Sequence, residues 1–293
     1  MVQSWLVLVF LAVAVPGLAQ DGVPADFEPS LIPLELVEDE TGVPREKLVN
    51  REVKEQYDLD LERGLPKSVL NTNILTPIKQ QGGRGTCTAF ATIAALEGVF
   101  GGKVELSEQH LYYQIKKFYF PKVDGIMPEV IHLYVEALNP LCVVAEADWP
   151  YNPQPVKGNI PQGPPPAGLE MRPQWCIEQS NHVGMVMVRN VSLLKAVLAE
   201  GNTVLLTVLL PMKWQEMWRG PKGLVDPGKL TWRSFVPVSA HSILLVGYDE
   251  EDRIIFRNSW GKAFGNQGYG TFSRKYLQMY ATSGFFVLEA GTK

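Results

Sequence analysis

The stretch Gln81-Gly82-Gly83-Arg84-Gly85-Thr86-Cys87-Thr88-Ala89-Phe90 decides the fold of this chain, and it continues as Ala91-Thr92-Ile93-Ala94-Ala95-Leu96-Glu97-Gly98. Three glycines in four positions predict a bendable loop. The apolar, alanine-rich run that begins at the cysteine and stops at Gly101-Gly102 is typical of a helix with a glycine stop. Because nearly every face of this helix is apolar, we expect it to be buried rather than amphipathic.

Cys87 stands at the N-terminus of this predicted helix. That end of a helix dipole is positive and favours a thiolate over a thiol. A lone cysteine is more often a small buried core side chain. The glycine loop in front of Cys87 favours the other interpretation, a helix start that presents a nucleophile.

The first 19 residues predict a secretory signal peptide. An unbroken apolar run, Leu6 to Val15, is followed by a Pro-Gly breaker and the small residue Ala19 before Gln20. The run is too short to span a membrane, and its leading residues carry no Lys or Arg, so the pattern is incomplete. We expect the mature protein to be secreted or extracytoplasmic (extracellular, periplasmic or lysosome-like) and not membrane-bound after signal cleavage.

The chain has three cysteines, Cys87, Cys142 and Cys176. Outside the cytosol an odd count suggests one disulfide and one thiol. If Cys87 is reactive, the other two are able to pair. Two buried thiols are an equally good interpretation of the sequence.

Charge is distributed unevenly along the chain. Residues 20–64 hold 13 acidic and 5 basic residues, whereas residues 65–293 hold 18 acidic and 22 basic ones. An acidic leader at 20–64 is able to dock on the basic body and inhibit its activity. Protonation of the leader's carboxylates in acid would then release the leader. A leader that is simply solvated is the alternative. The body has no basic cluster, so we expect no nucleic-acid partner.

The order of predicted elements indicates an α+β fold with two subdomains and a cleft between them. The main domain is predicted at 65–293, helical at about 75–185 and strand-rich at about 186–293. Helices are expected at 107–118 (with Ser107 as the N-cap), 128–138 and 192–200; strands at 203–210, 242–248, 254–257, 269–272 and 284–288; and extended loops at 150–173 and 211–237.

A cysteine nucleophile needs a base, and the chain offers four histidines. His110 and His132 fall in predicted helices and His182 lies near a loop, so each is expected to be an ordinary core or surface residue. His241 immediately precedes a buried strand, where an imidazole would project into the cleft.

Asn258 ends the next predicted strand, and the turn 249–252 joins the two strands as a hairpin. This pairing would bring Asn258 close to His241. An amide oxygen that accepts from the ring N–H fixes the tautomer and leaves the other ring nitrogen for the thiol.

Three motifs resemble those of papain-like cysteine peptidases: residues 81–90, 241–248 and 258–261. Weaker matches lie at 106–109, 124–127 and 146–151, so the likeness spans about 65–290 in the right order. The resemblance implies a papain-like fold, with a helical left subdomain, a β-barrel-like right subdomain and the active-site cleft between them.

The resemblance also implies roles for single residues. Cys87 would be the nucleophile, His241 the base and then the acid, and Asn258 the orienting group; the Gln81 side chain and the Cys87 N–H would form the oxyanion hole. Trp260 would shield the Asn258–His241 hydrogen bond. Further substrate contacts are expected from Gly85, Gly125, Ile126, Met127, Ala240, Ser242 and Trp260, with an apolar preference two residues before the cut.

Some positions depart from the family pattern. Arg84 replaces a disulfide cysteine whose partner is also missing, so the glycine loop has to be held in another way. Thr86 replaces serine, Thr88 replaces tryptophan and Phe264 replaces a second tryptophan. The leader is shorter than the usual prosegment of the family.

The sequence therefore predicts a secreted, monomeric cysteine endopeptidase acting on peptides or proteins. A catalytically silent module that binds peptides is one alternative. A transpeptidase or an exopeptidase with the same residues is another. An exopeptidase needs a segment that blocks the cleft, and residues 152–175 or 211–237 are candidates for it. No ligand set for a metal or organic cofactor is present in the sequence, so we expect neither.

Overall fold

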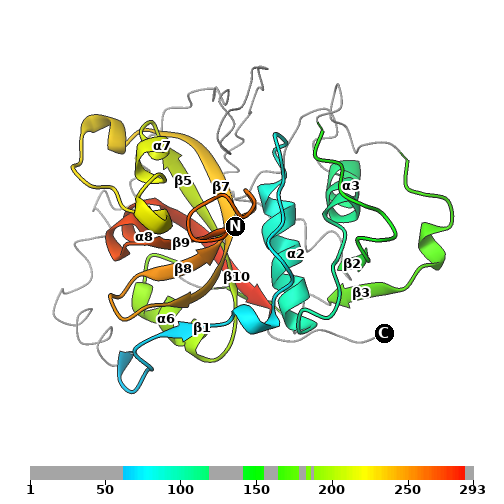
Figure 1. Cartoon of the computed structure of the whole chain (residues 1–293), viewed down its shortest axis with the longest axis horizontal. Coiled ribbons are helices and arrows are strands. Elements are labelled where there is room, and N and C mark those ends of the chain that lie inside the picture. The colour runs from blue at the N-terminus through cyan, green and yellow to red at the C-terminus, as the bar shows by residue number, and fades with distance from the viewer. Residues whose placement is uncertain (1–61, 119–140, 155–163, 178–182, 186–187, 288–293) are drawn as a thin grey trace, which may run out of the picture.

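The protein has two lobes with one long helix between them (Figure 1). The computed structural model describes residues 62–118, 141–154, 164–177, 183–185 and 188–287. The expected signal peptide, nearly all of the leader, the helix expected at 128–138 and Gly125–Met127 lie outside the described residues. His132 and His182 do so as well.

The first lobe contains the two longest of the described helices and a small sheet: α2 (Cys87–Val99), α3 (Glu108–Phe118), β2 (Leu141–Val144), η4 (Leu169–Met171) and β3 (Gln174–Ile177). The short elements β1 (Val69–Leu70) and η2 (Thr72–Ile74) precede them.

The second lobe contains the large sheet and its covering helices: β4 (Val183–Met185), α6 (Val191–Ala199), β5 (Val204–Pro211), α7 (Trp214–Met217), η5 (Pro221–Gly223), β6 (Leu224–Val225), η6 (Trp232–Ser234), β7 (Pro237–Tyr248), β8 (Ile254–Arg257), β9 (Tyr269–Phe272), α8 (Arg274–Tyr280) and β10 (Ala281–Val287). The strand order is β4-β10-β5-β7-β8-β9-β6, with β1 paired to β7.

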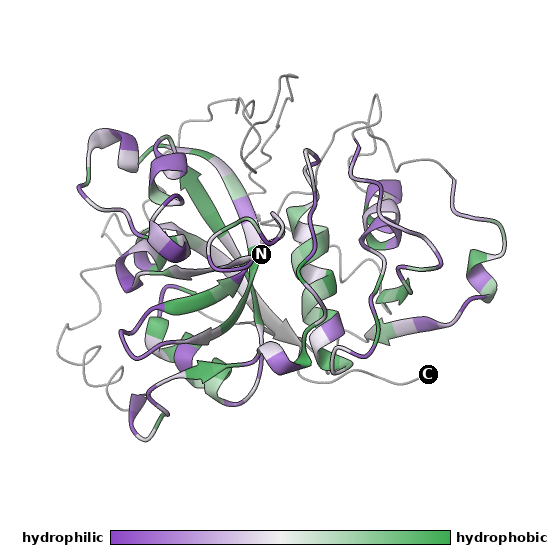
Figure 2. Ribbon diagram, in the orientation of Figure 1, coloured by the Kyte–Doolittle hydropathy of each residue, from purple (hydrophilic) through white to green (hydrophobic). Residues whose placement is uncertain are grey.

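Helix α2 confirms the prediction made from its apolar sequence. Every residue from Cys87 to Gly98 is buried, and Figure 2 shows α2 mainly hydrophobic along its length. Its core cluster joins α3 and β2 to Leu205 and Leu244 of the large sheet. Two glycines with left-handed backbone follow the end of the helix, with φ 68° at Gly101 and 65° at Gly102, a conformation that favours glycine.

Strand β7 is longer than the sequence pattern predicted. It begins at Pro237, so His241 lies inside the strand, where it pairs with Val208 of β5, and not just before it. The sequence pattern did not reveal this extension, because the polar Ser239 and the small Ala240 interrupt the run of large apolar residues that marks a buried strand. The hairpin of β7 and β8 has the expected turn at 249–252.

The segment 211–237 is more ordered than the extended loop that we expected. It contains α7, η5, β6 and η6. Trp214 and Trp218 are buried in the core of the sheet lobe, whereas Trp232 is 66% exposed. The indole N–H of Trp218 donates to the hydroxyl of Tyr276 at 2.8 Å. Packing of these large side chains, rather than local periodicity, orders the segment.

Helix α8 was missed from the sequence. Ser273 caps it, accepting from the Tyr276 N–H at 3.2 Å, and Tyr276, Leu277 and Tyr280 are buried. These residues recur at helical spacing, which was the available signal. The strand that follows begins at Ala281 instead of Gly284.

The helical lobe confirms the predicted cap and settles the cysteine pairing. Ser107 accepts from the His110 N–H at 3.0 Å, as an N-cap does. Cys142 and Cys176 are directly opposite in the β2–β3 ladder and form a disulfide. Cys87 keeps its thiol.

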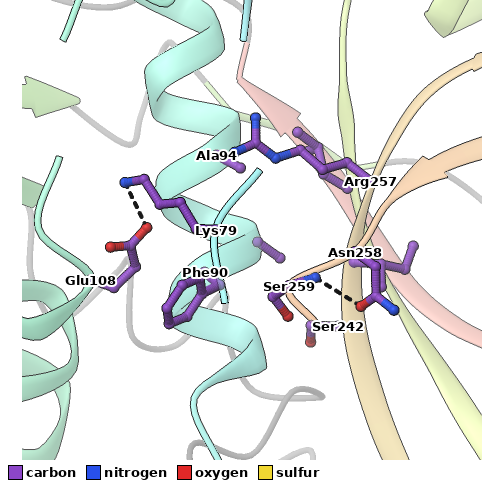
Figure 3. A pocket seen from close by; sticks show the side chains of 11 residues that line it. Lys79, Phe90, Ala94, Glu108, Ser242, Arg257, Asn258 and Ser259 are labelled. Carbon is purple, nitrogen blue, oxygen red and sulfur yellow. Dashed lines mark hydrogen bonds and ion pairs between the residues drawn. The ribbon is translucent and has the colours of Figure 1, made fainter. Parts of the chain in front are cut away.

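A buried group of charges lies beside α2. The Lys79 ammonium is 2.8 Å from a Glu97 oxygen. It is 2.9 Å from a Glu108 oxygen, a contact drawn in Figure 3. Glu97 also accepts hydrogen bonds from the Leu106 N–H and the Thr76 hydroxyl. Burial raises the pKa of Glu108 to about 8; Lys79 opposes this shift, and Glu97 adds to it. With a pKa of about 8, the buried Glu108 carboxyl is mostly protonated at pH 7.

Glu108→Gln is expected to make the protein more stable at alkaline pH. The folded-state pKa of Glu108 is raised from 4.5 to about 8, so the native state binds the extra proton and wild-type stability falls as pH rises through this window. Glutamine mimics the protonated acid at every pH. The free energy of unfolding of the variant, measured by thermal melts, should match that of wild type near pH 4.5 and exceed it at pH 8 by at least about 1 kcal/mol. Equal pH slopes for the two proteins would contradict this assignment.

Glu62, near the end of the predicted leader, is held on the sheet lobe. Glu62 accepts from the Ser192 hydroxyl at 2.5 Å, from Lys195 at 3.0 Å and from Arg274 at 2.8 Å. Burial alone would raise the pKa of Glu62, but these three hydrogen bonds outweigh it and lower the pKa to about 2. Their stabilisation is complete above pH 4.5 and is lost only as pH falls toward 2. Acid therefore weakens this contact only below about pH 4.5.

Candidate active site

His241 and Asn258 are hydrogen-bonded, as the hairpin predicted. The His241 Nε2 lies 2.9 Å from the Asn258 Oδ1. The same oxygen accepts the backbone N–H of Ser259 at 2.8 Å, a bond drawn in Figure 3. A backbone N–H is always a donor, so the atom facing it is the amide oxygen. Nε2 of the neutral ring must then carry the proton, and Nδ1 is left with a lone pair.

Aromatic rings enclose this hydrogen bond. The Trp260 ring stacks on the His241 ring with centroids 4.6 Å apart, and the Trp218 ring meets it edge-on at 5.5 Å. Phe264 packs edge-on against Trp260 at 5.4 Å. His241 is 4% exposed, and its burial lowers its pKa to about 4, against the opposing effect of the Asn258 bond. The imidazole is therefore neutral at pH 7 when no anion lies near it.

The N-terminus of α2 is fixed against β7. The Thr88 hydroxyl lies 3.1 Å from the Ser242 hydroxyl, and these residues directly follow Cys87 and His241 in the chain. Cys87 is the first residue of α2 and is 8% exposed. The first N–H groups of a helix have no acceptor within the helix, so this end is suited to an anion.

The Gln81 amide is oriented from both ends. Its Oε1 accepts from the Ser259 hydroxyl at 2.5 Å, and its Nε2 donates to the Arg84 carbonyl at 2.8 Å. The backbone N–H of Gln81 donates to the Ser259 carbonyl at 2.8 Å. The second hydrogen on Nε2 remains for another acceptor.

Ser259 and Trp218 belong to the site although the sequence analysis gave them no role. Ser259 orients both amides, with its N–H on Asn258 and its hydroxyl on Gln81. Its position between Asn258 and Trp260 was a usable signal. Trp218 is 23 residues before His241, in a segment without periodicity, so no local pattern pointed to it.

The remaining predicted contact residues are spread around the site. Gly85 and Ala240 are half-buried, and Ser242 is buried with its hydroxyl near those of Thr88 and Thr207. Ser242 and Asn258 also line a small pocket between α2 and β7 (Figure 3).

Within the described ranges, His, Cys, Asp and Glu nowhere gather in a group of three that could hold a metal ion. None of the helices in those ranges has the length and apolarity needed to cross a bilayer.

Comparison with known proteins identifies a matching family and relatives of similar sequence. Residues 65–285 match the family model described as papain family cysteine protease. Chymopapain from Carica papaya is 28% identical over 223 residues, which are 72% of this chain and 55% of that protein. Thiol protease aleurain from Arabidopsis thaliana is 26% identical over 220 residues, 71% of this chain and 56% of that protein. The chain thus spans about half the length of these two relatives.

Solved structures share the fold. Xylellain, a cysteine protease from Xylella fastidiosa, superposes with a TM-score of 0.62 at 23% identity, covering 78% of this chain and 88% of that one. The Amb a 11 cysteine protease, a ragweed pollen allergen in its proform, superposes with a TM-score of 0.55 at 22% identity. The match covers 80% of this chain and 70% of that one. These likenesses confirm the α+β, papain-like fold. Because the family model covers most of the chain in addition, the protein belongs to the papain family of cysteine proteases.

Proposed function

We propose that the protein is a cysteine peptidase that cleaves peptide bonds through an acyl-enzyme. The observation that carries this proposal is the fixed tautomer of His241, whose Nε2–H is held by Asn258 and whose Nδ1 keeps its lone pair. A base in this state accepts the proton of a thiol.

The reaction follows from the groups at the site. Cys87 Sγ gives its proton to His241 Nδ1 and attacks the peptide carbonyl carbon. The oxyanion of the tetrahedral intermediate accepts from the second Gln81 Nε2–H and from the Cys87 N–H, an arrangement worth about 2.7–4 kcal/mol per donor. As the C–N bond breaks, the imidazolium protonates the leaving amine. Water, deprotonated by His241, then attacks the thioester and releases the acid and the Cys87 thiol.

We expect Cys87 and His241 to ionise together, because burial disfavours an imidazolium that stands alone. With its pKa lowered to about 4, the imidazole is neutral unless a negative charge lies beside it. A thiolate at Cys87 supplies that charge, and the helix dipole of α2 stabilises it. The two groups would therefore titrate as a couple.

Product mapping on an unblocked peptide library tests the proposal. We expect cuts inside the peptides, with an apolar residue two positions before the cut. Release of one or two residues from the chain ends only would show an exopeptidase, and ligation of fragments a transpeptidase. No cleavage, together with no alkylation of Cys87 by iodoacetamide at pH 7, would favour a silent module.

We propose secretion and a docked leader as further parts of this function. The support for docking is Glu62, bound by Ser192, Lys195 and Arg274 beside the turn that follows Tyr248. Tyr248 lies seven residues, roughly 20 Å, along β7 from His241, so this anchor does not itself cover the site. Inhibition would need the preceding residues to reach the cleft. Equal kcat/KM for the full chain and for a chain that begins at Glu62 would exclude it.

A further inference from the structure

Arg84, in the glycine loop, is a buried cation that has no carboxylate partner in the part of the chain that the structure describes. It is 2% exposed, and none of the ion pairs among the described residues involves it. Its guanidinium carbon lies 4.8 Å from the ring centroids of both Tyr112 and Tyr151. Its Nη1 donates to the Gln109 side-chain oxygen at 3.0 Å and to the Asn152 carbonyl at 2.5 Å. The side chain therefore ties the loop to α3 and to the segment after β2.

The backbone of Arg84 holds the predicted oxyanion donor. Its carbonyl accepts from the Gln81 Nε2 at 2.8 Å and from the Thr86 N–H at 2.9 Å. The Tyr151 hydroxyl donates to the Gln81 carbonyl at 2.8 Å and lies 2.8 Å from the Thr86 hydroxyl. A displacement of Arg84 would thus move the amide of Gln81 directly.

The energetics argue against a mainly stabilising role for the guanidinium. Its Nε and Nη2 are buried and have no hydrogen-bond partner among the described residues. Burying an incompletely paired charge is costly, and replacement by an apolar side chain of similar volume is often neutral. The contacts that remain are directional, and they fix where the loop sits.

We propose that Arg84 is a positioning residue that acts on the reaction through the amide of Gln81. This inference rests on the proposed peptidase function. The side chain sets the place of its own carbonyl, the carbonyl sets the direction of Gln81 Nε2, and Nε2 receives the oxyanion. In this chain the arginine takes the place that the family resemblance gives to a disulfide cysteine.

A double-mutant cycle on purified protein tests the proposal: wild type, Arg84→Met, Gln81→Ala and the double variant. Arg84→Met is expected to lower kcat about 10-fold, because small misplacements of catalytic groups are costly, with KM unchanged within about twofold. In the Gln81→Ala background the same change should cost less than about twofold, since the amide is already absent. Alkylation of Cys87 by iodoacetamide forms no oxyanion, so its rate should stay within about twofold of wild type.

Two further variants control the experiment. Arg172→Met removes an arginine whose side chain is 60% exposed, and it should leave kcat unchanged. Tyr151→Phe keeps the ring and removes the hydroxyl that donates to the Gln81 carbonyl. If Arg84→Met fails to fold, Tyr151→Phe takes its place in the double-mutant cycle with Gln81→Ala. A kcat loss that persists in the Gln81→Ala background, or that is matched by slower alkylation, would overturn the proposal. Wild-type protein without turnover would remove the proposed function and this inference with it.

Discussion

Cys87→Ser is expected to lower kcat/KM for peptide hydrolysis by at least about 10⁴-fold. A hydroxyl is a much weaker acid than a thiol, whose ordinary pKa is about 8.5, so a serine gives its proton to the imidazole of His241 far less readily. Serine is nearly the same size, so the melting temperature should change by no more than a few degrees. A fluorogenic peptide assay with thermal melts measures both quantities.

The disulfide provides the matched control for this substitution. Cys142→Ser with Cys176→Ser removes two sulfur atoms from the helical lobe, away from α2's N-terminus. Opening a cross-link with a sequence separation of 34 residues is expected to cost about 2–4 kcal/mol of stability. The folded protein should still turn over substrate. A Cys87→Ser variant that keeps more than about 1% of wild-type kcat/KM would place the nucleophile elsewhere.

The parts of the site that the sequence predicted depend on short-range geometry. Helix α2 could be predicted because its residues are apolar on nearly every face, and its glycine stop is local. The His241–Asn258 contact could be predicted because one tight turn sets the register of β7 and β8. Both inferences needed only neighbouring segments.

The parts that the sequence did not predict depend on packing between distant segments. Trp218 reaches His241 from a segment with no periodic pattern. Arg84 is an ordinary polar loop residue until Tyr112 and Tyr151 enclose it, and these lie 28 and 67 residues further along the chain. Side-chain contacts of this kind leave no local signal, so the brace of the glycine loop remained an open question at the level of sequence.

His241→Ala is expected to move the pH profile of Cys87 alkylation toward that of an ordinary thiol. In the proposed mechanism the wild-type thiolate is paired with imidazolium, so alkylation by iodoacetamide should reach half its plateau rate well below neutral pH. Without the imidazole only the dipole of α2 remains, and the half-plateau point should rise toward about 8.5. Each profile is normalised to its own plateau, because a thiolate becomes less nucleophilic as its pKa falls. Peptide hydrolysis should fall by at least about 10⁴-fold.

His110 is the matched control, since it is also a buried histidine whose pKa burial lowers to about 4. It lies in the helical lobe, where its Nδ1 accepts the Val144 N–H at 3.2 Å. His110→Gln should lower stability and leave the alkylation profile in place, because a histidine that is merely buried has no effect on a distant thiol. An unchanged profile in His241→Ala would contradict the thiolate–imidazolium pair. A shifted profile in His110→Gln would show that the thiol responds to the stability of the fold and not to its base.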